Sequence, residues 1–62
     1  MKPYELEILS LIAQGFTSKE IAVKTKYAFT SVESYREKMI KKIGAKNTAH
    51  MVSIAYQNGL LK

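Results

Sequence analysis

The chain has 62 residues, which is enough for one domain with a single small core, and 47% of them are hydrophobic. It has no cysteine, which excludes a disulfide scaffold and thiolate metal sites. Residues 19–46 hold eight basic and three acidic side chains, so this stretch carries the whole net charge of +5. Such a basic middle fits either a polyanionic partner or a solvated surface that serves solubility.

Membrane and catalytic functions find no support in the residue pattern. No apolar run is long enough to span a bilayer, and the N-terminus lacks the order of a signal peptide, so a cytoplasmic location is expected. Basic and apolar residues do not segregate along one long helix, as a membrane-surface peptide requires. His50 is the only histidine and has no second ligand nearby, and no paired acids or activated nucleophile occur. We expect no enzyme activity, no metal and no cofactor.

The first helix is expected over about residues 3–14. Pro3 suits the first helical position, and Gly15 suits a left-handed residue that ends the helix. Met1 is expected to pack just before the start of this helix. Ile8 and Leu11 widen an apolar face whose central positions repeat with helical spacing: Leu6, Leu9, Ile12 and Ala13.

The second helix is short. Thr17 and Glu20 have the spacing of a capping box, in which each side chain satisfies a free backbone N–H of the first turn. Ile21 and Ala22 point inward, and the helix is expected to stop near residues 25–26, after about two turns. Residues 26–29 form the turn that follows.

The third helix is expected over residues 30–43. Thr30 and Glu33 have the spacing of a second capping box, and Gly44 ends the helix. Its inward face holds Val32, Met39 and Ile43, with Tyr35, Arg36 and Ile40 on the flanks. Its opposite face is polar and mostly charged: Ser34, Glu37, Lys38 and Lys41.

The fourth helix is capped by Asn47 or Thr48 and ends at residues 58–59. Its inward residues are Met51, Val52 and Ala55, and Leu60 and Leu61 are expected to fold back onto the core.

A short helix, a tight turn and a longer basic helix form the order of a helix-turn-helix unit. In such units the second helix enters the major groove and the first crosses the DNA backbone. We therefore expect one all-α domain over residues 1–62, a compact four-helix helix-turn-helix fold whose recognition helix spans about 30–43.

The chain also resembles the LuxR/GerE-type helix-turn-helix domains. The resemblance is strongest over residues 12–22, Ile-Ala-Gln-Gly-Phe-Thr-Ser-Lys-Glu-Ile-Ala, which match the family's run from the first helix into the second. Further matches run to the end of the chain: Glu5, Glu7, Ile8, Leu9, Val32, Met39, Lys42, Ile43, Gly44, Ala55, Gly59, Leu60 and Leu61.

The resemblance implies site residues. It places Glu33, Ser34 and Glu37 at base edges. It places five residues at phosphates: Thr17, Ser18, Lys19, Tyr35 and Lys42. The start and outer face of the third helix add four phosphate candidates: Thr30, Ser31, Lys38 and Lys41. Capping remains the alternative for Glu33, and plain solvation remains the alternative for Ser34, Lys38 and Lys41.

The chain departs from the family pattern at five positions. Glu33 stands where lysine is usual, although a carboxylate can accept a hydrogen bond from cytosine N4. Tyr35 stands in place of histidine, and Arg36 occupies a usually apolar position, where its stem can pack while its head reaches outward. Thr48 replaces an arginine. Ala28 replaces a capping serine, and Thr30 is expected to take over that cap.

The resulting prediction is sequence-specific binding of double-stranded DNA by a bacterial transcription regulator. The resemblance implies a homodimer on DNA through the fourth helix, and a receiver or ligand-sensing domain as partner if the chain is a fragment. The dimer candidates are Ser53, Ile54 and Gln57, which lie on the side of this helix away from its apolar face. The alternative is a helix-turn-helix scaffold that serves as a protein-interaction or anti-regulator module with weak DNA binding. The acids Glu33 and Glu37 and an exposed Ile54 favour this alternative.

Overall fold

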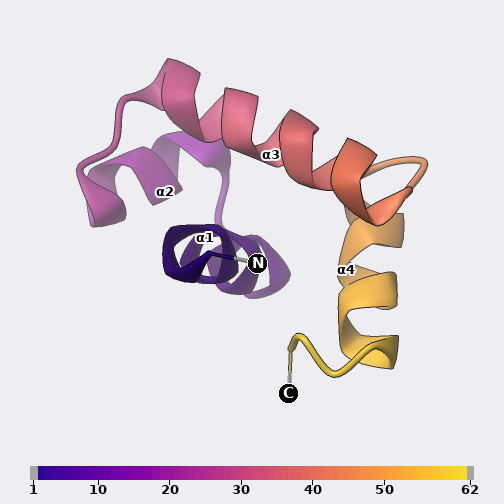
Figure 1. Ribbon diagram of the computed structural model, residues 1–62. Helices are drawn as coiled ribbons and strands as arrows, with labels where there is room; N and C mark the ends of the chain where they lie inside the picture. Colours follow the sequence, from indigo (N-terminus) through magenta and orange to yellow (C-terminus); the bar gives the residue numbers. More distant parts are fainter. Residues whose placement is uncertain (1, 62) are drawn as a thin grey trace.

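The computed structural model describes residues 2–61, and within this range the chain forms four helices and no strand. The helices are α1 (Pro3–Ala13), α2 (Ser18–Thr25), α3 (Phe29–Ile43) and α4 (Thr48–Gln57). The predicted all-α fold is confirmed, whereas the expected packing of Met1 lies outside the described residues. Figure 1 shows α3 crossing over the other three helices, with α2 beneath its first turns, α1 beneath its middle and α4 descending from its far end.

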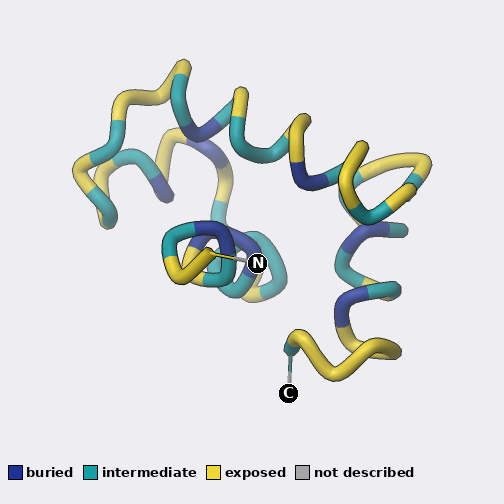
Figure 2. The backbone as a smooth tube through the Cα atoms, viewed as in Figure 1, coloured by how far each residue is buried: buried dark blue, intermediate teal, exposed yellow. Residues whose placement is uncertain are grey.

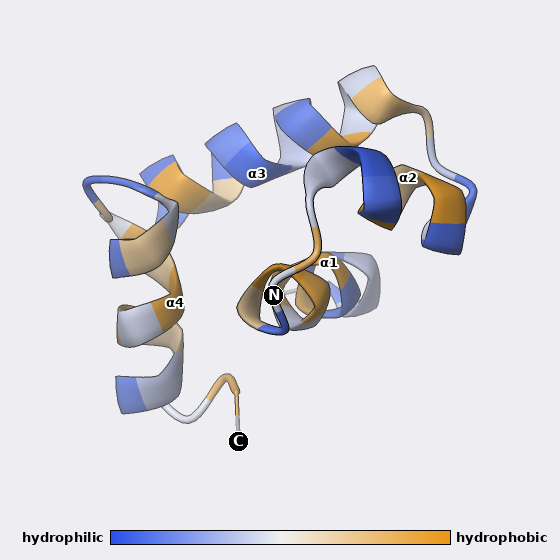
Figure 3. Cartoon of the chain, turned by 180° about the vertical axis from the view of Figure 1, so that it is seen from behind, coloured by the Kyte–Doolittle hydropathy of each residue, from blue (hydrophilic) through white to orange (hydrophobic). Residues whose placement is uncertain are grey.

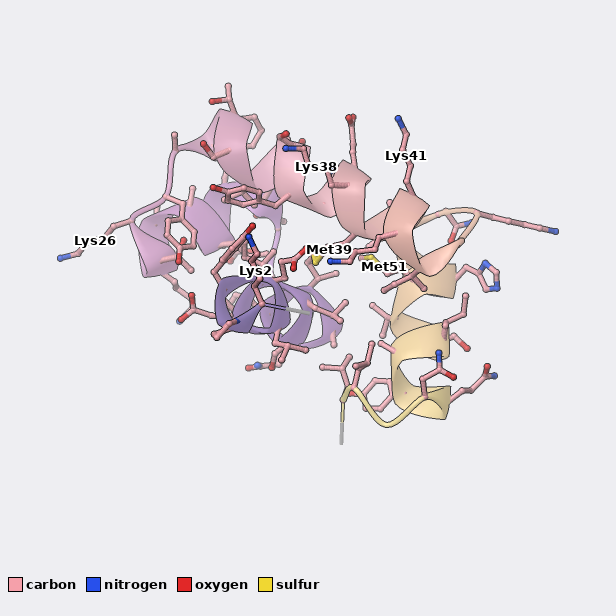
Figure 4. The ribbon with its side chains drawn as sticks, viewed as in Figure 1. Lys2, Lys26, Lys38, Met39, Lys41 and Met51 are labelled. Carbon is pink, nitrogen blue, oxygen red and sulfur yellow. The ribbon has the colours of Figure 1, made fainter. Side chains whose placement is uncertain are left out.

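Every helix contributes to a single core. Its fully buried residues lie in the space between α1 and the other three helices, where Figure 2 shows the buried segments facing one another: Ile8, Leu9, Ile21, Val32, Met39, Met51 and Ala55. Figure 4 shows Met39 of α3 and Met51 of α4 in the interior of the molecule, where both are fully buried. Flexible methionine side chains suit this position because they adapt to an irregular space.

The predicted inner face of α1 is confirmed at Leu9, which is fully buried, but the face is centred differently from the prediction. Ile8, predicted at its edge, is also fully buried, whereas Leu6, Ile12 and Ala13 are only half-buried. The reason is that α1 packs against α2, α3 and α4 at once, so its most enclosed positions lie between these contacts. Helical spacing identifies an apolar stripe, but the arrangement of neighbouring helices decides which edge of the stripe is deepest.

Two predicted helix caps are present. Thr17 Oγ1 accepts a hydrogen bond from the Glu20 N–H at 3.2 Å, and Glu20 Oε1 accepts one from the Thr17 N–H at 2.9 Å. Asn47 Oδ1 accepts a hydrogen bond from the His50 N–H at 2.8 Å and so caps α4. These contacts satisfy backbone donors that have no partner within the helix.

The second predicted capping box is wrong. Helix α3 begins at Phe29, its N-cap residue is Ala28, and no side chain caps it. Thr30 therefore lies inside the first turn, one residue after the start. The Glu33 carboxylate accepts a hydrogen bond from Ser18 of α2 instead. A partner 15 residues away in the chain has displaced the local backbone contact that the spacing indicates.

Two helix ends depend on glycine. Gly15 follows α1 with a φ of 95°, and Gly44 follows α3 with a φ of 79°. The N–H of Phe16 then donates to the Leu11 carbonyl, and the N–H of Ala45 donates to the Ile40 carbonyl. Left-handed glycine makes this closure possible without a steric penalty. At the end of the chain Leu61 packs against the core as expected, while Leu60 is 38% exposed.

Lys26, at the end of α2, is the only non-glycine residue with positive φ among residues 2–61, with φ of 65°. A left-handed L-residue is strained by about 1–2 kcal/mol, and glycine relieves this at a smaller entropic cost. We expect Lys26→Gly to raise the free energy of unfolding by about 0.5–1 kcal/mol in urea denaturation. Lys24→Gly, inside the same helix, is the control and should lower it by about 1 kcal/mol. A destabilised Lys26→Gly protein contradicts the prediction.

Candidate nucleic-acid interface

Helices α2 and α3 form the predicted helix-turn-helix unit. Residues 26–28 join them, and buried Ile21 and Val32 hold one helix against the other. Figure 1 shows α2 alongside the beginning of α3, on the side of the molecule away from α4. The unit therefore leaves the outer surface of α3 uncovered by any other helix within residues 2–61.

The outer surface of α3 carries one continuous exposed stripe. Its members recur at intervals of three and four residues, so that they share one face of the helix: Thr30, Ser34, Glu37, Lys38 and Lys41, called the outer stripe below. In Figure 4 Lys41 points away from α1 and α4, and Figure 3 shows hydrophilic segments along the outer side of α3. The outward placement predicted for Ser34, Glu37, Lys38 and Lys41 is confirmed.

Tyr35 lies on the flank of α3 rather than on the outer stripe. Its ring is half-buried, and its centroid is 5.1 Å from that of Tyr4 and 6.1 Å from that of Tyr27. The expected position at the edge of the core is confirmed. The tilted and edge-on geometries are those that aromatic pairs prefer, so the cluster stabilises the contact among α1, the turn and α3. Ser31, another phosphate candidate, is half-buried on the same helix.

Lys42 contacts α1. Its Nζ lies 3.5 Å from Glu5 Oε1, and the Glu5 side chain is 10% exposed whereas that of Lys42 is 57% exposed. Glu5 Oε1 also accepts a hydrogen bond from the Lys2 N–H at 3.0 Å. A DNA phosphate that contacts Lys42 therefore has to share the Lys42 ammonium group with the Glu5 carboxylate or displace that carboxylate. The sequence does not indicate the pair, because 37 residues separate its members in the chain.

We expect these contacts to make the stability of the protein sensitive to acid. The Lys2 N–H, with the Lys42 charge, holds the pKa of Glu5 below its ordinary 4.5, and burial opposes this only in part. A carboxylate with a lowered pKa in the folded state stabilises it above the ordinary value, and this stabilisation is lost as the pH falls through the folded pKa. We expect the free energy of unfolding to decline below pH ~4.5.

Glu5→Gln should make that decline shallower, as measured by urea unfolding at a series of pH values between neutrality and pH ~3. Glu20 adds to the remaining slope, because the Thr17 N–H lowers the pKa of its carboxylate too. Glu7→Gln removes an exposed carboxylate from the same helix and is the control. An equally steep decline in Glu5→Gln contradicts the prediction.

The Glu33 carboxylate lies between the two helices of the unit. Glu33 Oε2 accepts a hydrogen bond from Ser18 Oγ at 2.9 Å and lies 2.6 Å from Arg36 Nη2. Ser18 is the first residue of α2 and only 8% exposed. Arg36 thus packs on the flank of α3 as expected, and its head is paired. The spacing of Glu33 and Arg36 on one helix indicates their contact, but nothing in the sequence indicates the role of Ser18.

The N-terminal end of α2 presents Lys19 and the N-cap residue Thr17. Both are exposed, and Thr17 is engaged by the capping box with Glu20. Lys24, further along α2, lies with its Nζ 4.6 Å from the centroid of the Phe16 ring. Exposed lysines therefore lie on α2 as well as on the outer stripe of α3.

The surface of α4 that is predicted to form a dimer contact is only partly exposed. Ser53 and Gln57 are exposed, but Ile54 is half-buried, so the expectation of an exposed isoleucine there is wrong. The α4 residue that the sequence reasoning missed is Tyr56, which is 49% exposed. Its position three residues after Ser53, which puts the two on one side of the helix, was the available signal. His50 Nδ1 accepts a hydrogen bond from the Lys46 N–H at 3.0 Å, which ties the α3–α4 loop to α4.

Residues 2–61 contain neither a metal-binding cluster nor a membrane-spanning helix. No group of three metal-ligating side chains comes together in this range. No helix in the described part of the chain is long and apolar enough to cross a membrane.

Comparison with known proteins gives a family match. The sequence model of the family described as bacterial regulatory proteins, luxR family, matches residues 3–55, which include all of the helix-turn-helix unit. This family consists of regulatory proteins rather than enzymes, in agreement with the prediction of no enzyme activity. No solved structure matches the chain.

Curated relatives give the same result. The chain is 36% identical to "Response regulator Rre1" of Synechocystis sp. over 58 residues, which are 94% of this chain and 25% of that protein. It is 40% identical to "Oxygen regulatory protein NreC" of Staphylococcus aureus over 58 residues, or 94% of this chain and 27% of that protein. The chain thus spans about a quarter of the length of the curated relatives it matches.

Proposed function

The chain belongs to the luxR family of bacterial regulatory proteins, as a DNA-binding helix-turn-helix domain of a transcription regulator, and we propose that it binds double-stranded DNA sequence-specifically through α3. The observation that carries the proposal is the outer stripe, an exposed polar face of α3 with Lys38 and Lys41 that no other helix within residues 2–61 covers. The major groove is wide enough for one helix and presents a distinct pattern for each base pair. We further propose that residues 1–62 act as one DNA-binding unit.

Within the groove, Ser34 and Glu37 of the outer stripe are the proposed base readers. A serine hydroxyl can donate or accept, and a carboxylate accepts from the N4 amine of cytosine. Glu33 belongs to the same predicted set. Its carboxylate is held by Ser18 and Arg36, so a base contact from Glu33 requires these interactions to break.

Phosphate contacts are proposed on both sides of the outer stripe. On α2 the proposed donors are Thr17, Ser18 and Lys19, at a helix N-terminus whose free N–H groups favour anions. On α3 they are Thr30, Ser31, Tyr35, Lys38, Lys41 and Lys42. Ser18 Oγ and Lys42 Nζ already have acidic partners, so we expect Lys19, Lys38 and Lys41 to provide most of the affinity.

A homodimer on DNA is proposed through Ser53, Ile54 and Gln57 of α4. Two copies would read two half-sites about one helical turn apart. Relatives whose printed names describe a response regulator and an oxygen regulatory protein support a place in signal-dependent transcription, with a receiver or ligand-sensing domain as partner if the chain is a fragment.

The test is selection of preferred sites from random duplexes, followed by binding measurements on the selected site and on a scrambled duplex of equal length. We expect an enriched sequence that contains paired half-sites. Repeating the selection with Glu37→Gln should change the preference at one position of each half-site. If no sequence is enriched and no duplex is bound at ~50 mM salt, the proposal is wrong.

The interaction-module alternative loses two of its three supports. Ile54 is half-buried, and Glu33 is engaged by Ser18 and Arg36, which leaves Glu37 as the exposed acid of that set. DNA binding is therefore the function that we propose.

A further inference from the structure

The Glu33 carboxylate connects the helix that carries the proposed phosphate contacts to the helix that carries the proposed base contacts. One oxygen, Oε2, meets both Ser18 Oγ at 2.9 Å and Arg36 Nη2 at 2.6 Å. The side chains of Glu33 and Arg36 are 36% and 33% exposed, so the bridge is partly shielded from water. Hydrogen bonds to an ionised group are stronger than those between neutral groups.

The contact between Ser18 and Glu33 lies next to the residues that are proposed to bind DNA. Ser18 lies between Thr17 and Lys19, and all three are proposed phosphate contacts of α2. Glu33 directly precedes Ser34 on α3. Phosphate contacts fix the register of a protein on the duplex, and base contacts must then fall within a few tenths of an ångström of their partners. A link between Ser18 and Glu33 holds these two sets of groups at a constant separation.

The ion pair with Arg36 explains how an acidic residue, Glu33, can stand on the helix that is proposed to enter the DNA groove. An unpaired carboxylate beside a DNA groove is repelled by the phosphates, whereas a paired carboxylate presents little net charge. The pair with Arg36 therefore allows Glu33 to bind Ser18 without opposing the approach of DNA.

We propose that Glu33 is a positioning residue for base recognition, which acts through Ser18 and Arg36 and does not itself touch a base. The inference rests on the proposed function and deepens it. Loosening the link should weaken binding to the preferred site, where phosphate and base contacts must form together. Binding to a scrambled duplex depends on phosphates alone, so breaking the link should change it little. A phosphate contact that is lost with the Ser18 hydroxyl itself lowers both affinities by the same factor.

The experiment measures the ratio of affinities for the selected site and the scrambled duplex. A loss of folded protein lowers both affinities by the same factor, so this ratio isolates positioning from stability. The variants are Ser18→Ala, Glu33→Gln and the double variant. The controls are Ser10→Ala and Glu7→Gln, which remove a hydroxyl and a charge from α1.

We expect Ser18→Ala to lower the ratio about two- to tenfold, the range for one hydrogen bond. Glu33→Gln should lower it at least as much, and the double variant no further than the stronger single change, because both changes break one link. The controls should keep the original ratio. Glu33→Gln preserves the shape of the side chain and decides the question if Ser18→Ala does not fold.

Two results overturn the inference while leaving the proposed function intact. One is an unchanged ratio in both Ser18→Ala and Glu33→Gln. The other is a new base preference at a single position in Glu33→Gln while Ser18→Ala keeps the ratio, since this identifies Glu33 as a base reader. Failure of the unaltered chain to prefer its selected site overturns the proposed function and the inference together.

Discussion

Replacement of Ile21 by alanine is expected to remove most of the stability of this protein. Ile21 is fully buried and anchors α2, which has only eight residues. Truncating a buried isoleucine costs about 2–5 kcal/mol, and a domain of this size has only about 3–9 kcal/mol in total. A helix of two turns does not persist without its packing, so α2 should unfold first. Urea denaturation followed by circular dichroism measures the loss.

Val23→Ala is the matched control for Ile21→Ala. Val23 is a β-branched apolar residue of the same helix, but it is 80% exposed. Its truncation should change the free energy of unfolding by about 0.5 kcal/mol or less, because no packing is lost. Equal effects of the two substitutions contradict the placement of α2 on the core.

Binding to duplex DNA is expected to weaken steeply with salt. Four lysines among the proposed phosphate contacts, Lys19, Lys38, Lys41 and Lys42, give a logarithmic slope of about −3.6 for one subunit, because each neutralised phosphate releases condensed counterions. Between ~50 and ~200 mM salt the affinity then falls about 150-fold for one subunit and about 2 × 10⁴-fold for two. Fluorescence anisotropy of a labelled duplex measures the slope and also distinguishes a monomer from a dimer on DNA.

Lys41→Gln should make this slope shallower by about 0.9 for each subunit, which corresponds to one lost phosphate contact. Lys24→Gln is the control, because it makes the same change of charge at a lysine that lies over the Phe16 ring and outside the proposed contacts. A slope near zero in the unaltered chain, or equal effects of the two variants, would count against the outer stripe as the binding face.

Local features of this protein were predictable from the sequence by itself. The four helices, the Thr17–Glu20 capping box, the Asn47 cap and the glycine-terminated ends of α1 and α3 depend on groups within a few residues of one another, so spacing reveals them. The outward face of α3 follows from helical periodicity for the same reason. The two helices of the binding unit could thus be identified without coordinates.

Contacts between distant residues were decided only by the tertiary structure. Lys42 lies beside Glu5, and Glu33 lies beside Ser18, because α3 crosses α1 and α2 at these points. The second capping box failed for this reason: once α2 packs against α3, the Ser18 hydroxyl is the donor within reach of the Glu33 carboxylate. Sequence spacing records only neighbours along the chain, whereas a charged side chain bonds to whichever donor the packing of the helices brings to it.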